Sequence, residues 1–255
     1  MFVSALFAQA LLATAALAIP TSKERHDARV ARRAGGLRQS VPRITNSSHV
    51  EYSSNWAGAV YNSAAGTYKS VTASFVVPTP KSSGSGGSQA ASAWVGIDGD
   101  SCGNAILQTG VDFNVDGGSV SFDAWYEWYP DYAYDFSGIS FEAGDSVTLT
   151  VTASSTTKGT AVITNNSNGQ SVSKSISSSS ALCEQDAEWI VEDFEEGNSL
   201  VPFANFGTVS FTGASAKTAS GSVGPGSANI IDIQQNGKTL TSVSTSNSGV
   251  TVKYI

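Results

Sequence analysis

The sequence predicts an all-β protein built as an antiparallel two-sheet β-sandwich, and three observations lead to that fold class. Short runs of β-branched, aromatic and alternating residues recur along the chain, separated by Gly, Ser, Asn and Asp. No longer stretch has the apolar period of about 3.6 residues that marks an amphipathic helix. Residues 51–255 have a length common for a single β-sandwich domain.

The first 18 residues predict a signal peptide, because they are apolar, uncharged and end in the small-residue pattern Ala16-Leu17-Ala18. A transmembrane anchor is the alternative, but the run is short and Pro20 closes it. We therefore expect a secreted, extracellular protein with no membrane span.

Residues 19–50 have a basic character that predicts a pro-segment. They hold seven of the 14 Lys and Arg residues, including the dibasic pair Arg32-Arg33, and they lack an apolar period. From Glu51 onward the balance reverses: seven lysines face 19 acidic residues, a net charge near −12. So acidic a domain excludes nucleic acid as a partner.

The histidine and cysteine content of residues 51–255 limits the catalytic mechanisms that this region can support. Both histidines, His26 and His49, lie upstream, so Ser-His and Cys-His nucleophile pairs and nearly all catalytic zinc sites are excluded from this region. Cys102 and Cys183 are the only cysteines, and in a secreted protein they predict one disulfide. The sequon at Asn165 lies in a turn-like stretch and predicts a glycosylation site.

The β-pattern divides residues 51–255 into successive short strands. We expect them at 70–77, 119–129, 146–154, 160–165, 170–177, 208–214, 228–235, 239–246 and 250–255. The low-complexity stretch 78–92, rich in Gly and Ser, is expected to be a flexible loop open to nicking.

Two stretches resemble binding sites, but their sequences do not show whether they bind a ligand or are purely structural. The sequence WVGIDGD (94–100) begins like a calcium loop, but Cys102 and Thr109 stand where ligands should be, which favours a Gly-rich turn. In DAWYEWYPDYAYDF (123–136), alternation places Trp125, Glu127 and Tyr129 on one face of a strand. Core packing and an aromatic binding row for sugars or peptide side chains both remain open here.

Two further stretches offer catalytic groups. In AILQTGVDF (105–113), Gln108 lies on an apolar strand, where its amide either has a structural hydrogen bond or serves as a non-titrating donor to an oxyanion. In AEWIVEDFEEG (187–197), a helix would stack like charges, whereas a strand puts Glu188 and Glu192 on one face beside apolar side chains. The pattern leaves both carboxyl groups as candidates.

Together the motifs YSSNWAGAV, ASAWVGIDGD, AILQTGVDF, DAWYEWYPDYAYDF, AEWIVEDFE and VGP resemble the fungal glutamic peptidases (eqolisins), in the same order from about Glu51 to Ile255. The resemblance implies a concanavalin A-like or jelly-roll sandwich with two seven-stranded sheets. It implies an acid endopeptidase acting on polypeptides, insensitive to pepstatin, with Glu188 and Gln108 as the catalytic pair and with neither metal nor cofactor.

The same resemblance assigns a substrate-binding groove to six residues: Trp56, Trp94, Asp98, Asp112, Asp123 and Tyr129. We expect a monomer. A relative matures into two non-covalent chains by excision near the loop 78–92, which here lacks a dibasic site, so two-chain maturation stays open.

Two rival functions remain at this point: a β-sandwich glycoside hydrolase with a Glu pair, and a secreted sugar-binding module. The spacing of the acids in 188–196 departs from the E-x-D-x-x-E of sandwich glucanases, which counts against the first.

Overall fold

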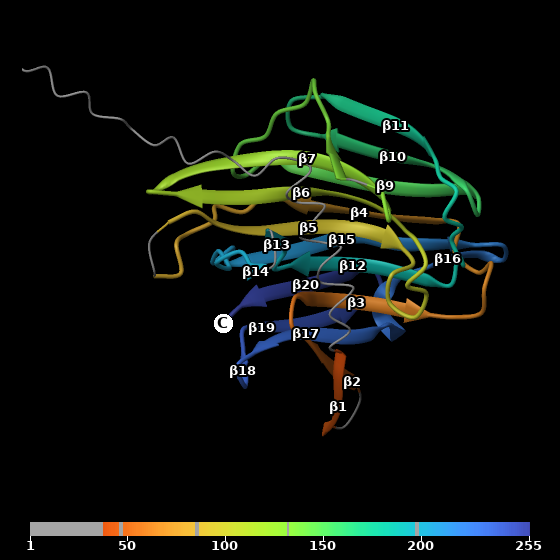
Figure 1. Ribbon diagram of the computed structural model, residues 1–255, viewed down its shortest axis with the longest axis horizontal. Helices are drawn as coiled ribbons and strands as arrows, with labels where there is room; N and C mark the ends of the chain where they lie inside the picture. Colours follow the sequence, from red (N-terminus) through yellow and green to blue (C-terminus); the bar gives the residue numbers. More distant parts are fainter. Residues whose placement is uncertain (1–37, 46–47, 85–86, 132, 197–198) are drawn as a thin grey trace, which may run out of the picture.

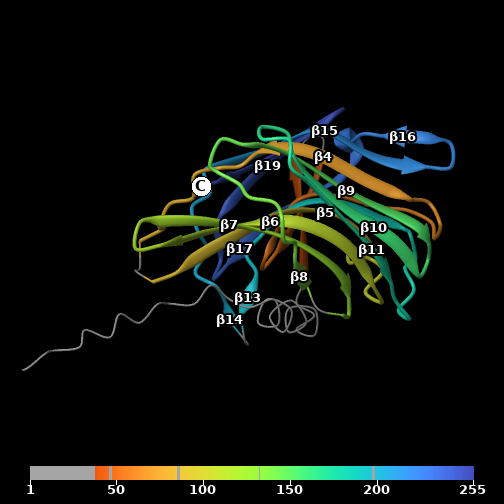
Figure 2. The same ribbon diagram turned by 90° about the horizontal axis from the view of Figure 1, so that it is seen from above.

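Two twisted β-sheets stacked face to face form the molecule (Figures 1 and 2). The structure is a computed structural model that describes residues 38–45, 48–84, 87–131, 133–196 and 199–255. Within these ranges the only helical element is the 3-10 turn η1 (Pro225–Ser227). The expected signal peptide, and residues 19–37 of the expected pro-segment, lie outside the described residues.

The first sheet, called sheet A, has ten strands. Nine follow the order β1-β2-β17-β3-β12-β5-β6-β7-β8, and β18 pairs with β17. They are β1 (Arg38–Thr45), β2 (Ser48–Ser53), β17 (Asn229–Gln235), β3 (Trp56–Asn62), β12 (Asp186–Glu192), β5 (Gln89–Ile97), β6 (Ile106–Asp116), β7 (Ser119–Tyr129), β8 (Ala133–Asp135) and β18 (Lys238–Thr239). All pair antiparallel except β2, which runs parallel to β17.

The second sheet, called sheet B, has eight strands, seven of them in the order β11-β10-β9-β4-β15-β20-β19, with β16 paired to β15. They are β11 (Ser171–Ser177), β10 (Lys158–Asn165), β9 (Ser146–Ser155), β4 (Ser70–Val76), β15 (Thr208–Thr218), β20 (Gly249–Tyr254), β19 (Thr241–Ser246) and β16 (Gly221–Val223). A separate small hairpin joins β13 (Glu195–Glu196) to β14 (Ser199–Leu200).

Strand alternation explains how the sheets pack. In β9 the side chains Val147, Leu149 and Val151 are fully buried, whereas the intervening residues are half-exposed, so one face of sheet B points inward. Sheet A contributes Trp128 and Trp189 to the same core. Burying apolar surface between two such faces is the main stabilising term of a sandwich.

The predicted fold class is confirmed, and the strand count differs slightly from the expectation of seven per sheet. Each sheet contains a run of seven, from β17 to β8 in sheet A and from β11 to β19 in sheet B. The additional strands are the β1–β2 hairpin and the short strands β16 and β18. The expected boundary of the pro-segment, after residue 50, therefore falls inside β2.

The loop expected at 78–92 is shorter than the composition suggested. Strand β5 begins at Gln89, and Lys81 forms a bridge with Asn205 that fixes the start of the loop. The buried amide of Gln89 accepts a hydrogen bond from the backbone N–H of Ser83 (2.6 Å) and donates one to Ser82 (2.9 Å). These contacts anchor described residues at both ends of the segment that the composition marked as flexible.

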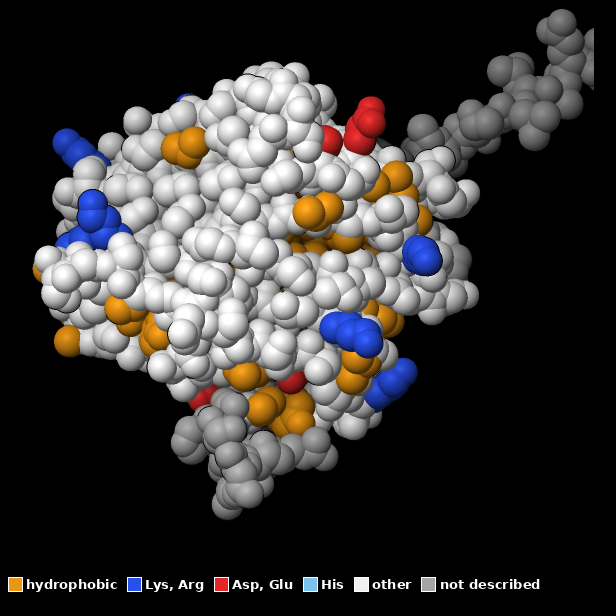
Figure 3. All heavy atoms as spheres, turned by 180° about the vertical axis from the view of Figure 1, so that it is seen from behind, with side chains coloured by type: hydrophobic (Ala, Val, Ile, Leu, Met, Phe, Trp, Pro, Cys, Tyr) orange, Lys and Arg blue, Asp and Glu red, His pale blue; other side chains and the backbone are white. Residues whose placement is uncertain are grey.

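The outward face of sheet B carries a ladder of hydroxyl groups. Ser70, Thr72 and Ser74 on β4 face Thr152, Thr150 and Thr148 on β9, with oxygen–oxygen distances of 2.9, 2.7 and 2.8 Å. Charged side chains are few and scattered on the face of the molecule drawn in Figure 3. Among the described residues, no helix has the length and apolar character needed to cross a membrane.

Candidate active site

The second face of sheet A, which points away from the sandwich core, collects the predicted site residues. Register places Glu188 opposite Gly96, Gly96 opposite Gln108, and Gln108 opposite Glu127, in one line across β12, β5, β6 and β7. Residues two positions along each strand share that face. Among the other side chains that it therefore carries are Trp56, Trp94, Asp112, Asp123, Tyr129 and Glu192.

Gly96 makes room between the two predicted catalytic side chains. Glu188 and Gln108 stand two strands apart, about 10 Å between backbones, and the residue between them has no side chain. A Cβ atom at Gly96 would lie 3.0 Å from Oε2 of Glu188 and 2.9 Å from Cζ3 of Trp94. The Glu188 carboxyl group therefore leans over Gly96, toward the strand that carries Gln108.

Gln108 is fully buried and one end of its amide is held by Glu127. Nε2 lies 2.6 Å from Oε2 of Glu127, which is also fully buried. Oε1 of Gln108 accepts no hydrogen bond within the described part of the chain. Sequence reasoning placed Glu127 on the correct face by alternation but assigned it no role, because nothing in a single strand shows which residue lies opposite.

The structure distinguishes the two carboxyl candidates of β12 by their partners. Glu192 accepts hydrogen bonds from the indole N–H of Trp94 (2.9 Å), the indole N–H of Trp56 (3.0 Å) and the amide of Asn55 (3.3 Å). The two indoles meet edge to face, with ring centroids 5.0 Å apart. Glu192 thus holds the two indole rings in place on this face, and the ring of Trp94 lies beside Gly96 and Glu188.

The other predicted groove residues line the same face toward β7. Asp112 is buried and accepts the indole N–H of Trp125 at 2.7 Å, and Asp123 accepts the amide of Asn114 at 2.9 Å. Asp112 and Asp123 are direct cross-strand neighbours, an arrangement that repels when both are ionised. Tyr129 is half-buried and packs against the apolar cluster that contains Trp56, Trp94 and Trp125.

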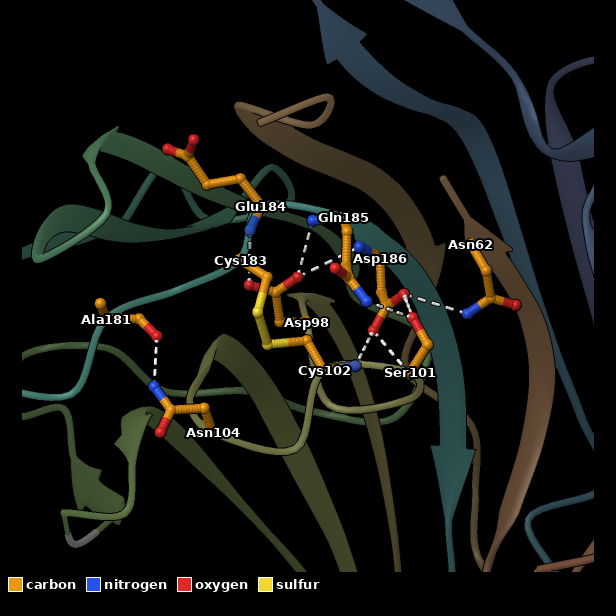
Figure 4. The surroundings of a disulfide bond; sticks show 10 residues. All are labelled: Asn62, Asp98, Ser101, Cys102, Asn104, Ala181, Cys183, Glu184, Gln185 and Asp186. Atoms are coloured by element: carbon orange, nitrogen blue, oxygen red, sulfur yellow. Dashed lines mark hydrogen bonds between the residues drawn. A yellow bond between two sulfur atoms is a disulfide. The ribbon is translucent and has the colours of Figure 1, made fainter. Parts of the chain in front are cut away.

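Asp98 lies apart from these residues, just beyond the end of β5, and its place in the groove stays a prediction. Its carboxylate is fully buried and accepts the backbone N–H groups of Glu184, Gln185 and Asp186 at 2.8, 2.8 and 3.1 Å (Figure 4). Burial raises the pKa of Asp98, and these three donors oppose the shift. The alternation that placed it on the face ends where β5 ends, at Ile97.

Asp186 makes the reciprocal hydrogen bonds, from the segment after Cys183 to the loop that follows β5. We call this pair of segments, joined through Asp98 and Asp186, the clasp. The Asp186 carboxylate accepts the backbone N–H of Ser101 (2.8 Å) and of Cys102 (3.0 Å), and the amide of Asn62 (3.0 Å). The predicted disulfide Cys102–Cys183 is confirmed and lies within this clasp (Figure 4). It links positions 81 residues apart, worth roughly 4–5 kcal/mol on the chain-entropy model.

The clasp holds the strands that carry the catalytic candidates. Asp98 follows Gly96 by two residues, and Asp186 precedes Glu188 by two. A cluster of Asp98, Cys102 and Cys183 has metal-like spacing, but sulfurs joined in a disulfide are not thiolate ligands, so these residues do not fit a metal.

The glycan expected at Asn165 does not fit the folded chain. The side chain is fully buried, and its amide nitrogen donates to the carbonyl of Ser140 (2.9 Å) and to Asp145 (2.8 Å). Its oxygen accepts the backbone N–H of Ser167 at 2.9 Å. A sugar on that nitrogen would displace these bonds, so Asn165 is a structural residue of the turn.

Comparison with known proteins gives a consistent result. Residues 54–254 match the model described as the Peptidase A4 family. The chain is 46% identical to Aspergillopepsin-2 of Aspergillus niger, covering 99% of both chains, and 45% identical to Scytalidopepsin B of Scytalidium lignicola, covering 91% and 89%.

Solved structures of such enzymes share the fold. A crystal structure of scytalido-glutamic peptidase with a transition state analog inhibitor has a TM-score of 0.73 at 44% identity, covering 79% of this chain and 98% of that one. The crystal structure of aspergilloglutamic peptidase from Aspergillus niger has a TM-score of 0.64 at 56% identity, covering 66% and 99%.

Proposed function

The chain belongs to the peptidase A4 family, the glutamic peptidases, and from that premise we propose that it is a secreted, pepstatin-insensitive acid endopeptidase whose catalytic pair is Glu188 and Gln108. One observation carries the assignment: the line Glu188–Gly96–Gln108 across three adjacent strands. It puts a carboxyl group and an amide on either side of a position without a side chain, where a peptide carbonyl and a water molecule can meet.

In the proposed mechanism water attacks the scissile carbonyl directly. Ionised Glu188 takes a proton from the water molecule while the oxygen of that water bonds to the carbonyl carbon. An N–H of Gln108 donates to the oxyanion of the tetrahedral intermediate, a contribution of about 3–4 kcal/mol in comparable sites. Protonated Glu188 then gives its proton to the leaving nitrogen as the C–N bond breaks. These steps use no metal, cofactor or acyl-enzyme.

The aromatic and acidic residues beside the pair form the proposed substrate groove. Trp56 and Trp94, held by Glu192, supply apolar walls, and Asp112, Asp123 and Tyr129 extend the face toward β7. In acid these carboxyl groups become protonated and can donate as well as accept hydrogen bonds to a peptide backbone.

Secretion and maturation complete the proposal. Residues 1–18 act as the signal peptide, and residues 19–50 as a basic pro-segment that offsets the acidic charge of the rest during folding. The mature domain then begins near Glu51 and acts as a monomer. Unchanged secretion yield after deletion of residues 19–50 would argue against the role of the pro-segment.

The decisive experiment is digestion of denatured haemoglobin at about pH 3 with pepstatin present. The peptidase produces fragments, whereas a glycoside hydrolase or a sugar-binding module produces none. Glu188→Gln and Gln108→Ala should each abolish the activity while circular dichroism stays unchanged. Full activity of folded Glu188→Gln would refute the assignment of the base.

A further inference from the structure

The contact between Gln108 and Glu127 raises a question of proton position. The two residues are cross-strand neighbours on β6 and β7, both are fully buried, and the amide and the carboxyl group lie 2.6 Å apart. The other end of the amide, turned away from Glu127, is the end that this contact leaves without a hydrogen bond among the described residues.

The protonation state of Glu127 decides whether the oxygen or the nitrogen of the Gln108 amide points away from Glu127. An ionised carboxylate only accepts, so it holds Nε2 of Gln108 and leaves the carbonyl oxygen Oε1 on the substrate side. A protonated carboxyl group donates its O–H, and the best acceptor is Oε1. The amide then turns over, because its two ends have nearly the same shape.

The spacing is compatible with the protonated arrangement. Heavy-atom distances of O–H···O bonds are about 2.5–3.0 Å, and the separation of 2.6 Å lies inside that range. The backbone N–H of Ser83 and Oε1 of Gln89 lie equally close, so the distance fits a short N–H···O bond as well. A carboxylic acid donating to the amide oxygen therefore fits the geometry, and the experiment below decides where the proton lies.

Building on the proposed function, we propose that Glu127 is a positioning residue that works in its protonated form. Its O–H group donates to Oε1 of Gln108 and turns both N–H groups of Nε2 toward the substrate side, where the oxyanion forms. Loss of that proton reverses the amide and presents a carbonyl oxygen to the oxyanion, which it repels. Activity in acid then requires Glu188 to be ionised and Glu127 to be protonated.

The groups around Glu127 define what else titrates nearby. Its lateral neighbours are Gln108 on β6 and Ala133 on β8, neither of which ionises. Ionisable residues on the same face by alternation are Asp123 and Tyr129 on β7, Asp112 and Asp116 on β6, Asp135 on β8, and Asp186, Glu188 and Glu192 on β12. No described lysine or arginine belongs to this face of the strands from β12 to β8.

The test compares kcat/KM against pH for the wild type, Glu127→Gln and Glu127→Ala. Glutamine at 127 can donate an N–H to Oε1 at every pH, so we expect acid activity within about threefold of the wild type and an alkaline limb displaced upward by about one pH unit or more. Alanine leaves the amide unheld, and kcat should fall roughly 10–100-fold with KM little changed. Glu142→Gln, at an exposed residue outside the strands of this face, controls for loss of one carboxyl group.

Two kinetic outcomes would overturn the inference: a Glu127→Gln variant with the wild-type alkaline limb, or a folded Glu127→Gln variant as inactive as Gln108→Ala. Infrared difference spectra between the wild type and Glu127→Gln provide a test that needs no activity. We expect a protonated carboxyl C=O band at about pH 3 that disappears at higher pH, and an ionised Glu127 at pH 3 would also refute the idea. If the wild type digests no protein, the proposed function is refuted. The infrared spectra would still report whether Glu127 is protonated.

Discussion

Replacing Asp232 with asparagine should remove a defined part of the pH dependence of stability. Asp232 lies on β17, is 8% exposed and accepts a hydrogen bond from the hydroxyl of Thr241 at 2.8 Å. Burial raises the pKa of its carboxyl group from 3.8 to about 6, a shift that the bond from Thr241 opposes. The folded protein therefore binds this proton more tightly than the unfolded chain does.

The sign and the size of the effect follow from linkage. Stability from Asp232 is fully present below pH 3.8, where both states are protonated, and is lost as the pH rises to about 6. Since each pKa unit is worth about 1.4 kcal/mol, the free energy of unfolding should fall by about 3 kcal/mol across that window. Asparagine keeps an acceptor for Thr241 and does not ionise, so the variant should lack this fall.

Urea unfolding from pH 3 to pH 7 measures the difference, in a Glu188→Gln background that prevents self-digestion. Asp145→Asn is the matched control, because the backbone N–H of Glu142 and the amide of Asn165 lower the pKa of that partly exposed carboxyl group. Its contribution has the opposite sign, appearing above the unfolded pKa. Parallel pH profiles for the wild type and Asp232→Asn would refute the reasoning.

Three further changes test other parts of the structure. Gly96→Ala puts a methyl group 3.0 Å from Oε2 of Glu188, so kcat should fall roughly 10–100-fold with the fold intact; wild-type kcat in a steady-state assay would contradict the placement of the carboxyl group. Replacing Cys102 and Cys183 with serine should lower the free energy of unfolding by about 2–5 kcal/mol, measured by urea titration, and an unchanged midpoint would show that the carboxylate clasp alone suffices. Peptide mapping by mass spectrometry should find Asn165 without a glycan, and an occupied site would mean that its buried hydrogen bonds do not form.

The fold was largely predictable because strand alternation is a local property. The pattern of 119–129 gives β7 with its observed bounds, and Trp125 and Trp128 lie on opposite faces as alternation requires. Both proved buried, and a single strand cannot reveal that the side chains on its two faces are both shielded from solvent.

The site was predictable only in part, because register between strands is not local. Alternation alone left Glu188 and Glu192 equivalent, and the resemblance to the family selected Glu188. The partnership of Gln108 with Glu127 depends on how β6 pairs with β7. Alternation does not extend to Asp98, because the chain leaves the strand one residue earlier, at Ile97, and turns with a positive φ of 66°.

The hydroxyl ladder on sheet B has a consequence for solubility in acid. Nineteen acidic residues in 51–255 lose their charge as the pH falls, and only seven lysines remain to keep molecules apart. Ser and Thr hydroxyl groups such as those facing each other on β4 and β9 bind water equally well at every pH. A face wetted by hydroxyl groups keeps its hydration layer when the carboxylates are neutralised, so we expect these serine and threonine residues to help keep the protein dispersed in acid.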